Sequence, residues 1–215
     1  APRHRLPSWM LRDQALAVSG LLNPAMGGPA MRPYQPEGLW NVVASNGGTR
    51  YKTDTGDKLY RKSMYTYWKR ASPPPSLLMF DAPTREFCTI TRGATNTPLQ
   101  ALVLWNDVQY VEAARMLAQQ MLLLDAPQEN DADHWRLTEL FKTCTGREPS
   151  DEETSLLYET LSSMRAKFET APEDALSLLE YGEAMVDPTL DPSKLAAYTL
   201  VANTILSLDE VINKN

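Results

Sequence analysis

Apolar residues recur at helical spacing throughout the second half of the chain. Thr97 followed by Pro98 is an N-cap with proline at the first helical position, and apolar residues follow at the spacing of one helix face. Asn106-Asp107 offers a second N-cap, so we expect two consecutive helices here. Further start and stop signals predict helices at 131–143 with Gly146 as C-cap, from Ser150 to 169, from Pro172 to Gly182, and from Asp191 onward. The pattern predicts a mostly α fold, a helical bundle or layered helices.

The first 98 residues have a different pattern, with fewer helical stretches. Ser8 is an N-cap candidate for a helix that should end near Gly20. Residues 58–70 fit either a helix or, because of their β-branched and aromatic content, a strand, and we prefer the helix. One further helical turn fits residues 76–80.

A long irregular segment lies between these stretches. Residues 23–57 hold four prolines and six glycines, a composition typical of a meandering loop. We expect Trp40, Val42 and Val43 to anchor this loop in the core. The fold class therefore includes a long irregular N-terminal part rich in proline and glycine.

Charge divides the chain at the same boundary. Residues 1–98 hold 13 Lys and Arg against 6 Asp and Glu, whereas residues 99–215 hold 8 against 21. Opposite charge favours docking of one segment on the other, although each exposed pair contributes only about 0–1 kcal/mol. We expect a single domain over 1–215, in which the basic, loop-rich segment 1–98 packs against the acidic, helical segment 99–215. The rival interpretation, a nucleic-acid partner, is opposed by the net charge of −6 and by the scatter of the basic residues.

Composition excludes several other classes. The chain has no run of 18 apolar residues, so no membrane span is expected. Cys88 and Cys144 are too few for a disulfide scaffold, and they either pair, if the protein is exported, or serve as small buried residues. Because no Cys-x-x-Cys motif is present, covalent haem attachment within this chain is not expected, and we predict no cofactor.

The histidines offer little for catalysis or metal binding. The chain has only His4 and His134, so a Ser–His–Asp arrangement has almost no candidates. A zinc site needs three or four ligands at short spacing, and only Asp131, Asp133 and His134 come close. Capping of a helix start is the simpler interpretation of that cluster, so we expect no metal. Whether the chain is an enzyme stays open.

The densest polar and aromatic stretch covers residues 60–100. Aromatic faces beside planar donors suit a sugar or peptide pocket, and the same side chains suit a structural network that fixes irregular chain against helices. In the structural alternative, which we favour, the arginines of this stretch pair with Asp81 and Glu86. The candidate residues are Arg61, Tyr65, Trp68, Asp81, Arg85, Glu86, Arg92 and Asn96.

Several of these stretches resemble one known family. Residues 60–70, 73–76, 80–86 and 95–102 closely resemble the planctomycete-specific domain of unknown function, with Thr145-Gly146-Arg147 and other short matches along nearly the whole chain. The chain resembles the C-terminal part of that domain, which follows a cytochrome-c-like module in large exported proteins. Where the family usually has proline after Asn-Asp, this chain has Val108. The resemblance implies an extracytoplasmic location and a haem c group in another domain of the parent protein, and it supplies no reaction.

Three functions are compatible with these observations. The first is a structural and interaction domain of a multidomain exported protein, whose partners are upstream domains of the same parent or a companion chain. The second is a carbohydrate-binding or carbohydrate-active domain that uses segment 60–100, in which Asp81 and Glu86 act as acid and base. The third, which we favour least, is an electron-transfer docking surface, where the basic segment meets an acidic cytochrome face.

Overall fold

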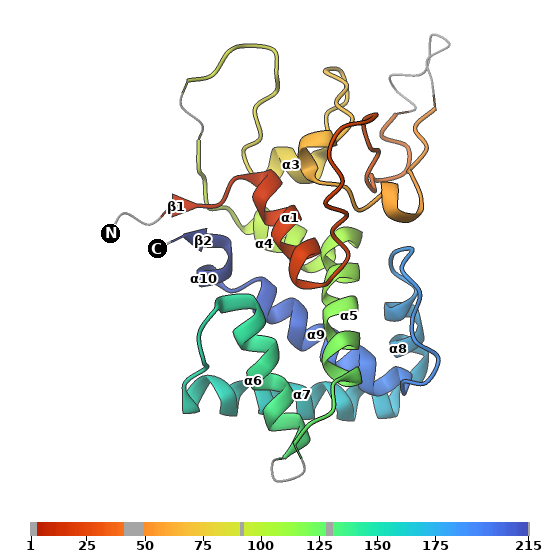
Figure 1. Ribbon diagram of the computed structural model, residues 1–215, viewed down its shortest axis with the longest axis vertical. Helices are drawn as coiled ribbons and strands as arrows, with labels where there is room; N and C mark the ends of the chain where they lie inside the picture. Colours follow the sequence, from red (N-terminus) through yellow and green to blue (C-terminus); the bar gives the residue numbers. More distant parts are fainter. Residues whose placement is uncertain (1–3, 41–49, 91–92, 128–130, 215) are drawn as a thin grey trace.

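Helices dominate the computed structural model, which describes residues 4–40, 50–90, 93–127 and 131–214 (Figure 1). The described residues form nine α-helices and one antiparallel two-stranded sheet, so the predicted mostly α fold is confirmed. The helices are α1 (Ser8–Val18), α3 (Pro75–Met79), α4 (Pro98–Asn106), α5 (Val108–Leu123), α6 (Ala132–Thr145), α7 (Asp151–Thr170), α8 (Pro172–Leu179), α9 (Pro192–Leu206) and α10 (Asp209–Ile212). The sheet pairs β1 (His4–Arg5) with β2 (Asn213–Lys214), which places the two ends of the described chain side by side.

The helix boundaries follow the capping signals of the sequence. The Asp107 side chain accepts a hydrogen bond from the Gln109 backbone N–H, so Asp107 alone separates α4 from α5, although the chain has Val108 instead of proline. Ser150 and Glu153 form a capping box at the start of α7. Gly146 adopts a φ of +78° and ends α6 in a left-handed cap.

The main core forms where α5 and α9 pack against each other, and α6, α7 and α8 surround this pair (Figure 1). Leu117 of α5 and Val201 of α9 are fully buried in this contact. Smaller apolar clusters join α1, α3 and α4 to α5, so the N-terminal helices extend the same packed body.

The helix predicted from the sequence for residues 58–70 is wrong. These residues begin at the end of one short 3₁₀ turn, Gly56–Lys58, contain a second, Ser63–Tyr65, and are otherwise irregular. Their backbone groups pair with the 23–31 segment instead: the Asn23 N–H donates to the Tyr60 carbonyl, and Met31 exchanges bonds with Tyr65 and Tyr67. Pairing between distant segments satisfies the backbone groups that a helix would use locally, and it overrides the helical periodicity.

We expected three residues to anchor the loop between α1 and these turns, and the structure describes one of them, Trp40. The side chain of Trp40 is 7% exposed, and its ring lies 5.0 Å from that of Tyr51. Val42 and Val43 lie outside the described residues.

Arg12 joins three parts of the chain at the inner face of α1. Its buried guanidinium donates to the carbonyl oxygens of Leu59 and Arg61 at 2.9 and 2.8 Å, and to the side chain of Gln109 on α5. Burial lowers the pKa of this guanidinium. The bonds hold the irregular segment between α1 and the helical core.

Glu112 forms a second buried junction, one turn further along α5. One carboxylate oxygen accepts from the Tyr60 hydroxyl at 2.8 Å and from the backbone N–H groups of Glu183 and Ala184 at 2.6 and 2.7 Å. Arg115 lies 4.0 Å from the same oxygen and donates to the Ala184 carbonyl. Burial and the bond to Glu112 raise the pKa of Tyr60, so its hydroxyl stays protonated and donates. We call Glu112, Arg115, Tyr60 and the 183–184 backbone the Glu112 junction.

The ion pairs found among the described residues do not join the two segments of opposite charge. Within the described residues, every ion pair closer than about 4 Å links groups of the same segment, for example Arg5 with Asp81 or Arg147 with Glu210. Buried hydrogen bonds and apolar packing connect the segments instead. The excess charge of each segment stays on its own surface.

Two further expectations concern pairing of the cysteines and a membrane-spanning helix. Cys88 is exposed on a loop, Cys144 is buried in α6, and both are free thiols. Among the described residues, no helix is both long enough and apolar enough to cross a lipid bilayer.

Candidate functional site

The candidate residues from the 60–100 stretch occupy three separate places rather than one pocket. Arg61 and Tyr65 lie against the 27–29 loop, Trp68 and Arg85 lie at the outer end of the molecule, and Asp81 and Asn96 lie near the N-terminus of α1. Glu86 is exposed beside Arg85, and Arg92 lies outside the described residues.

Arg61 has a structural environment. Its guanidinium carbon lies 3.9 Å from the centre of the Tyr65 ring, and its nitrogens donate to the carbonyl oxygens of Gly27 and Pro29. The Tyr65 hydroxyl accepts from the Gly27 N–H at 2.6 Å. Both side chains fix the glycine-rich loop, and the Tyr65 ring face that could stack on a sugar is covered by Arg61.

Trp68 and Arg85 form a second cation–ring pair, which is open to solvent on one side. The Arg85 guanidinium carbon lies 4.5 Å from the centre of the Trp68 ring, and the indole N–H donates to the Thr84 carbonyl at 3.2 Å. Arg85 has a φ of +64°, an uncommon backbone conformation for a residue other than glycine. This turn holds the Arg85 side chain over the ring while leaving the residue exposed.

A neighbouring row of cations and rings was not predicted from the sequence. The Lys69 ammonium lies 4.6 Å from the centre of the Trp40 ring, and the Arg32 guanidinium lies 5.2 Å from the centre of the Tyr67 ring. The rings of Trp40 and Tyr67 are themselves 5.9 Å apart. Each cation is far in the sequence from the ring that it covers, Lys69 from Trp40 and Arg32 from Tyr67, so spacing along the chain gives no signal for this row.

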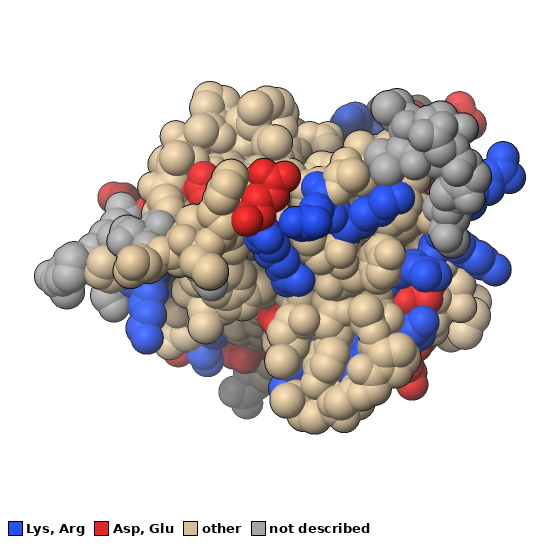
Figure 2. Space-filling model, turned by 90° about the horizontal axis from the view of Figure 1, so that it is seen from above, with Lys and Arg blue, Asp and Glu red and all other residues tan. Residues whose placement is uncertain are grey.

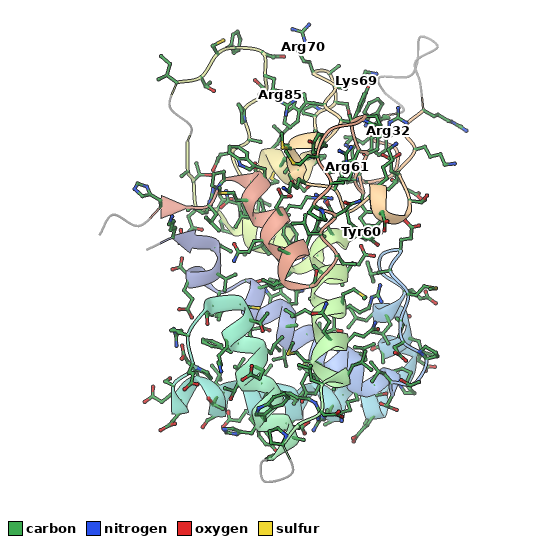
Figure 3. All side chains as sticks on the ribbon, in the orientation of Figure 1. Arg32, Tyr60, Arg61, Lys69, Arg70 and Arg85 are labelled. Atoms are coloured by element: carbon green, nitrogen blue, oxygen red, sulfur yellow. The ribbon has the colours of Figure 1, made fainter. Side chains whose placement is uncertain are left out.

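Together these pairs make one surface at the end of the molecule furthest from α7. Figure 3 places Arg32, Lys69, Arg70 and Arg85 around this end, while Tyr60 and Arg61 lie deeper. Figure 2 shows basic side chains running across it, with a smaller acidic group beside them. None of the four cations forms an ion pair with a described carboxylate. We call this surface the basic-aromatic face; it consists of Arg32, Lys69, Arg70 and Arg85 with the rings of Trp40, Tyr67 and Trp68.

Asp81 has a different partner from the one expected. The sequence suggested pairing with Arg61, Arg85 or Arg92, whereas one Asp81 oxygen lies 2.6 Å from Arg5 Nη2. The carboxylate also accepts from the backbone N–H and the hydroxyl of Thr95. Asp81 has a φ of +59°, in the turn that follows α3.

A cavity of about 350 Å³ lies beside this ion pair. Trp9, Asn96 and the Arg5–Asp81 pair contribute to its wall. The Asp81 oxygens are occupied by internal donors, and Glu86 is exposed elsewhere, so the two carboxylates do not face each other across this cavity. Among the described residues, no group of three or more His, Cys, Asp and Glu side chains is arranged to hold a metal ion.

One known protein family matches most of the chain. Residues 1–161 match the family described as PSD1, a protein of unknown function (DUF1553). The chain belongs to the DUF1553 family. No curated protein and no solved structure matches the chain.

The DUF1553 match covers the basic-aromatic face and the residues that Arg12 binds, whereas the 183–184 backbone of the Glu112 junction and part of the wall of the cavity beside Asp81 lie beyond residue 161. The family description names no activity. The function of this DUF1553 chain therefore has to be inferred from its surfaces.

Proposed function

We propose that the chain is an interaction domain that docks on an acidic protein surface through its basic-aromatic face. The observation that carries this proposal is the set of exposed or half-buried cations that lie over aromatic rings without a described carboxylate partner. Arginine, tryptophan and tyrosine are enriched among the residues that dominate binding energy at protein interfaces.

Stacking on the rings supports docking because it prepares the cations for binding. A cation held over a ring has fewer side-chain conformations to lose when it meets a carboxylate. Arginine can then bind the carboxylate through two parallel hydrogen bonds. The unpaired positive charge also speeds association with an acidic partner.

A protein partner agrees with the geometry better than a polysaccharide. Sugars stack on open aromatic faces, whereas Arg85 covers one face of Trp68, Arg61 covers Tyr65 and Lys69 covers Trp40. The guanidinium and ammonium groups stay available to carboxylates. The resemblance noted above supports a source for the partner: we propose that it is a neighbouring domain of a larger exported parent protein, such as a cytochrome-c-like module, or a companion chain.

Binding of the full chain to poly-L-glutamate tests this proposal, with calorimetry at low salt as the measurement. Lys69→Glu and Arg85→Glu should each weaken binding about tenfold, and the affinity of the unaltered chain should fall steeply as salt rises. Lys167→Glu is the matched control, because Lys167 also lies over a ring, 5.7 Å from the centre of Phe168, and changes the net charge equally.

Two results would overturn the proposal. One is equal weakening by the Lys167 control, which would show a response to net charge alone. The other is tighter binding to polygalacturonate or to a DNA oligonucleotide of similar charge, which would indicate a polysaccharide or a nucleic acid as the partner.

A carbohydrate site is the second candidate function, supported by the cavity beside Asp81. Trp9 and Asn96 line it, so it combines an aromatic residue with an amide that can bind hydroxyl groups. Asn96 is exposed, so Asn96→Ala should abolish binding in a glycan screen and leave the melting temperature unchanged. A glycan screen without any binding partner for the unaltered chain would refute this candidate.

A further inference from the structure

An apolar groove opens between α3 and α4, on a part of the surface distinct from the basic-aromatic face. Its volume is about 360 Å³. Most of its wall is apolar and comes from Pro75, Met79, Leu99, Leu102 and Val103. Leu99 and Leu102 remain more than half exposed, although apolar helix positions of this kind normally face a core.

The loop that connects α3 to α4 carries the complementary feature. Phe87 and Ile90 project from it and are the most exposed large aromatic and aliphatic side chains among the described residues of the N-terminal segment. The loop is fixed at its base, because Thr84 accepts a bond from Trp68 and Thr95 donates to Asp81. Figure 1 shows the described parts of the loop arching away from the helices, and none of the loop's described residues lines the groove.

The exposed apolar area is close to that of one side of a standard interface. Five large side chains of the loop and the two helices contribute to it: Phe87 76% exposed, Ile90 103%, Leu102 57%, Leu99 56% and Met79 39%. At about 200 Å² for a fully exposed residue of this size, they present roughly 700 Å² per copy. A standard protein interface buries about 800 Å² of each partner.

The lack of charged residues on α4 and at the loop tip indicates which partner can cover this surface. A two-fold contact places the same surface patch on both partners, so a patch with charge of one sign would repel itself. The whole of α4 contains no charged residue, and neither does the loop tip from Phe87 to Ile90. Asp107 is the one charged residue among the described residues of the groove wall, and its carboxylate is used as the N-cap of α5. The surface is therefore compatible with a second copy of itself, unlike the basic-aromatic face.

We propose that two copies of the chain associate about a two-fold axis, with Phe87 and Ile90 of each copy inserted into the α3–α4 groove of the other. Each copy supplies both a protruding loop and a groove, so the contact closes without leaving either feature exposed. The proposal goes beyond docking on an acidic partner and uses different residues.

Sedimentation equilibrium of the full chain at micromolar concentrations is the first test. A dimer is expected, and Phe87→Ser or Leu102→Glu should each weaken it at least about tenfold. Leu176→Glu is the matched control, since Leu176 is 54% exposed on α8 and should leave the dimer unchanged. Because apolar contacts dominate, dimerisation should persist at salt concentrations that abolish polyglutamate binding.

Cross-linking tests the geometry independently of affinity. Cys88 is exposed between Phe87 and Ile90, and Ser76 lines the groove, so Ser76→Cys should form a disulfide with Cys88 of the other copy under mild oxidation. Ser162→Cys, at an exposed position on α7, is the control for random collision. A monomer at all concentrations, a dimer insensitive to both substitutions, or equal cross-linking by the Ser162 control would overturn the proposal.

Discussion

Replacement of Gly182 by alanine probes the Glu112 junction directly. Gly182 has a φ of +86°, and a Cβ atom added there would lie 2.3 Å from the Glu112 side-chain carbon Cδ. The new methyl group must displace the carboxylate from the backbone N–H groups and from the Tyr60 hydroxyl. A left-handed backbone alone costs a residue with a Cβ about 1–2 kcal/mol. Weakening hydrogen bonds to a buried charged group costs a further 1.5–3 kcal/mol, so a total of roughly 3–5 kcal/mol is expected.

Gly146 provides the matched control. It has a φ of +78°, and an added Cβ would meet nothing within 4 Å. Gly146→Ala should therefore lower the free energy of unfolding only by the cost of the left-handed backbone conformation. Urea denaturation followed by far-ultraviolet circular dichroism should place Gly182→Ala about 2 kcal/mol or more below Gly146→Ala in free energy of unfolding. In a Glu112→Ala background, where the clash is absent, the two glycine substitutions should cost the same.

Equal costs of the two glycine substitutions in the unaltered chain would refute this reasoning. That result would mean that the 181–186 segment moves freely and that Glu112 does not hold the N-terminal segment to the helices. An extra cost that persisted in the Glu112→Ala background would equally contradict it, because the penalty would then come from another contact.

Three further predictions concern other buried or paired groups. Arg12→Met should lower the free energy of unfolding by about 3 kcal/mol or more in urea denaturation, because the buried carbonyl and amide oxygens that Arg12 binds lose their donor; a loss below about 1 kcal/mol would contradict its proposed role. The hydrogen bond from Arg147 lowers the pKa of Glu153 to about 2, so this carboxylate contributes stability above its ordinary value of 4.5, and the contribution is lost as pH falls toward 2. Arg147→Gln should reduce the change of the urea midpoint with pH over that range. An unchanged pH dependence of the midpoint would count against a stabilising Arg147–Glu153 pair. Burial raises the pKa of Cys144 to about 12 while Cys88 is exposed, so a thiol reagent should label one cysteine in the native chain and the second only in denaturant.

The helical second half was predictable because its signals are local. Prolines at first helical positions, the Ser150 capping box and Gly146 each act within one or two turns, and the structure has helix boundaries within a few residues of those expected. Residues 58–70 were misjudged because their backbone partners lie more than 30 residues away, in the 23–31 segment. A periodic pattern cannot reveal pairing of that kind.

The candidate site was predictable in its residue types and not in its pairings. Segment 60–100 does supply Trp68 and Arg85, which stack on each other. Other partners of this segment come from elsewhere in the chain: Lys69 lies over the ring of Trp40 in the basic-aromatic face, and Arg5 pairs with Asp81, 76 residues away, beside the cavity. Opposite charge of the two segments suggested ion pairs between them, whereas the structure joins them through buried hydrogen bonds that net charge does not predict.

Nuclear magnetic resonance of the ¹⁵N-labelled chain during titration with poly-L-glutamate tests the docking proposal most directly. The indole N–H signals of Trp68 and Trp40, which donate to Thr84 and Gln35, should shift together with backbone signals around Lys69 and Arg85. The indole signal of Trp135, on α6, should stay in place. Shifts centred on α6 to α8, or no shifts at a polyglutamate excess and low salt, would contradict the assignment of the basic-aromatic face as a docking surface.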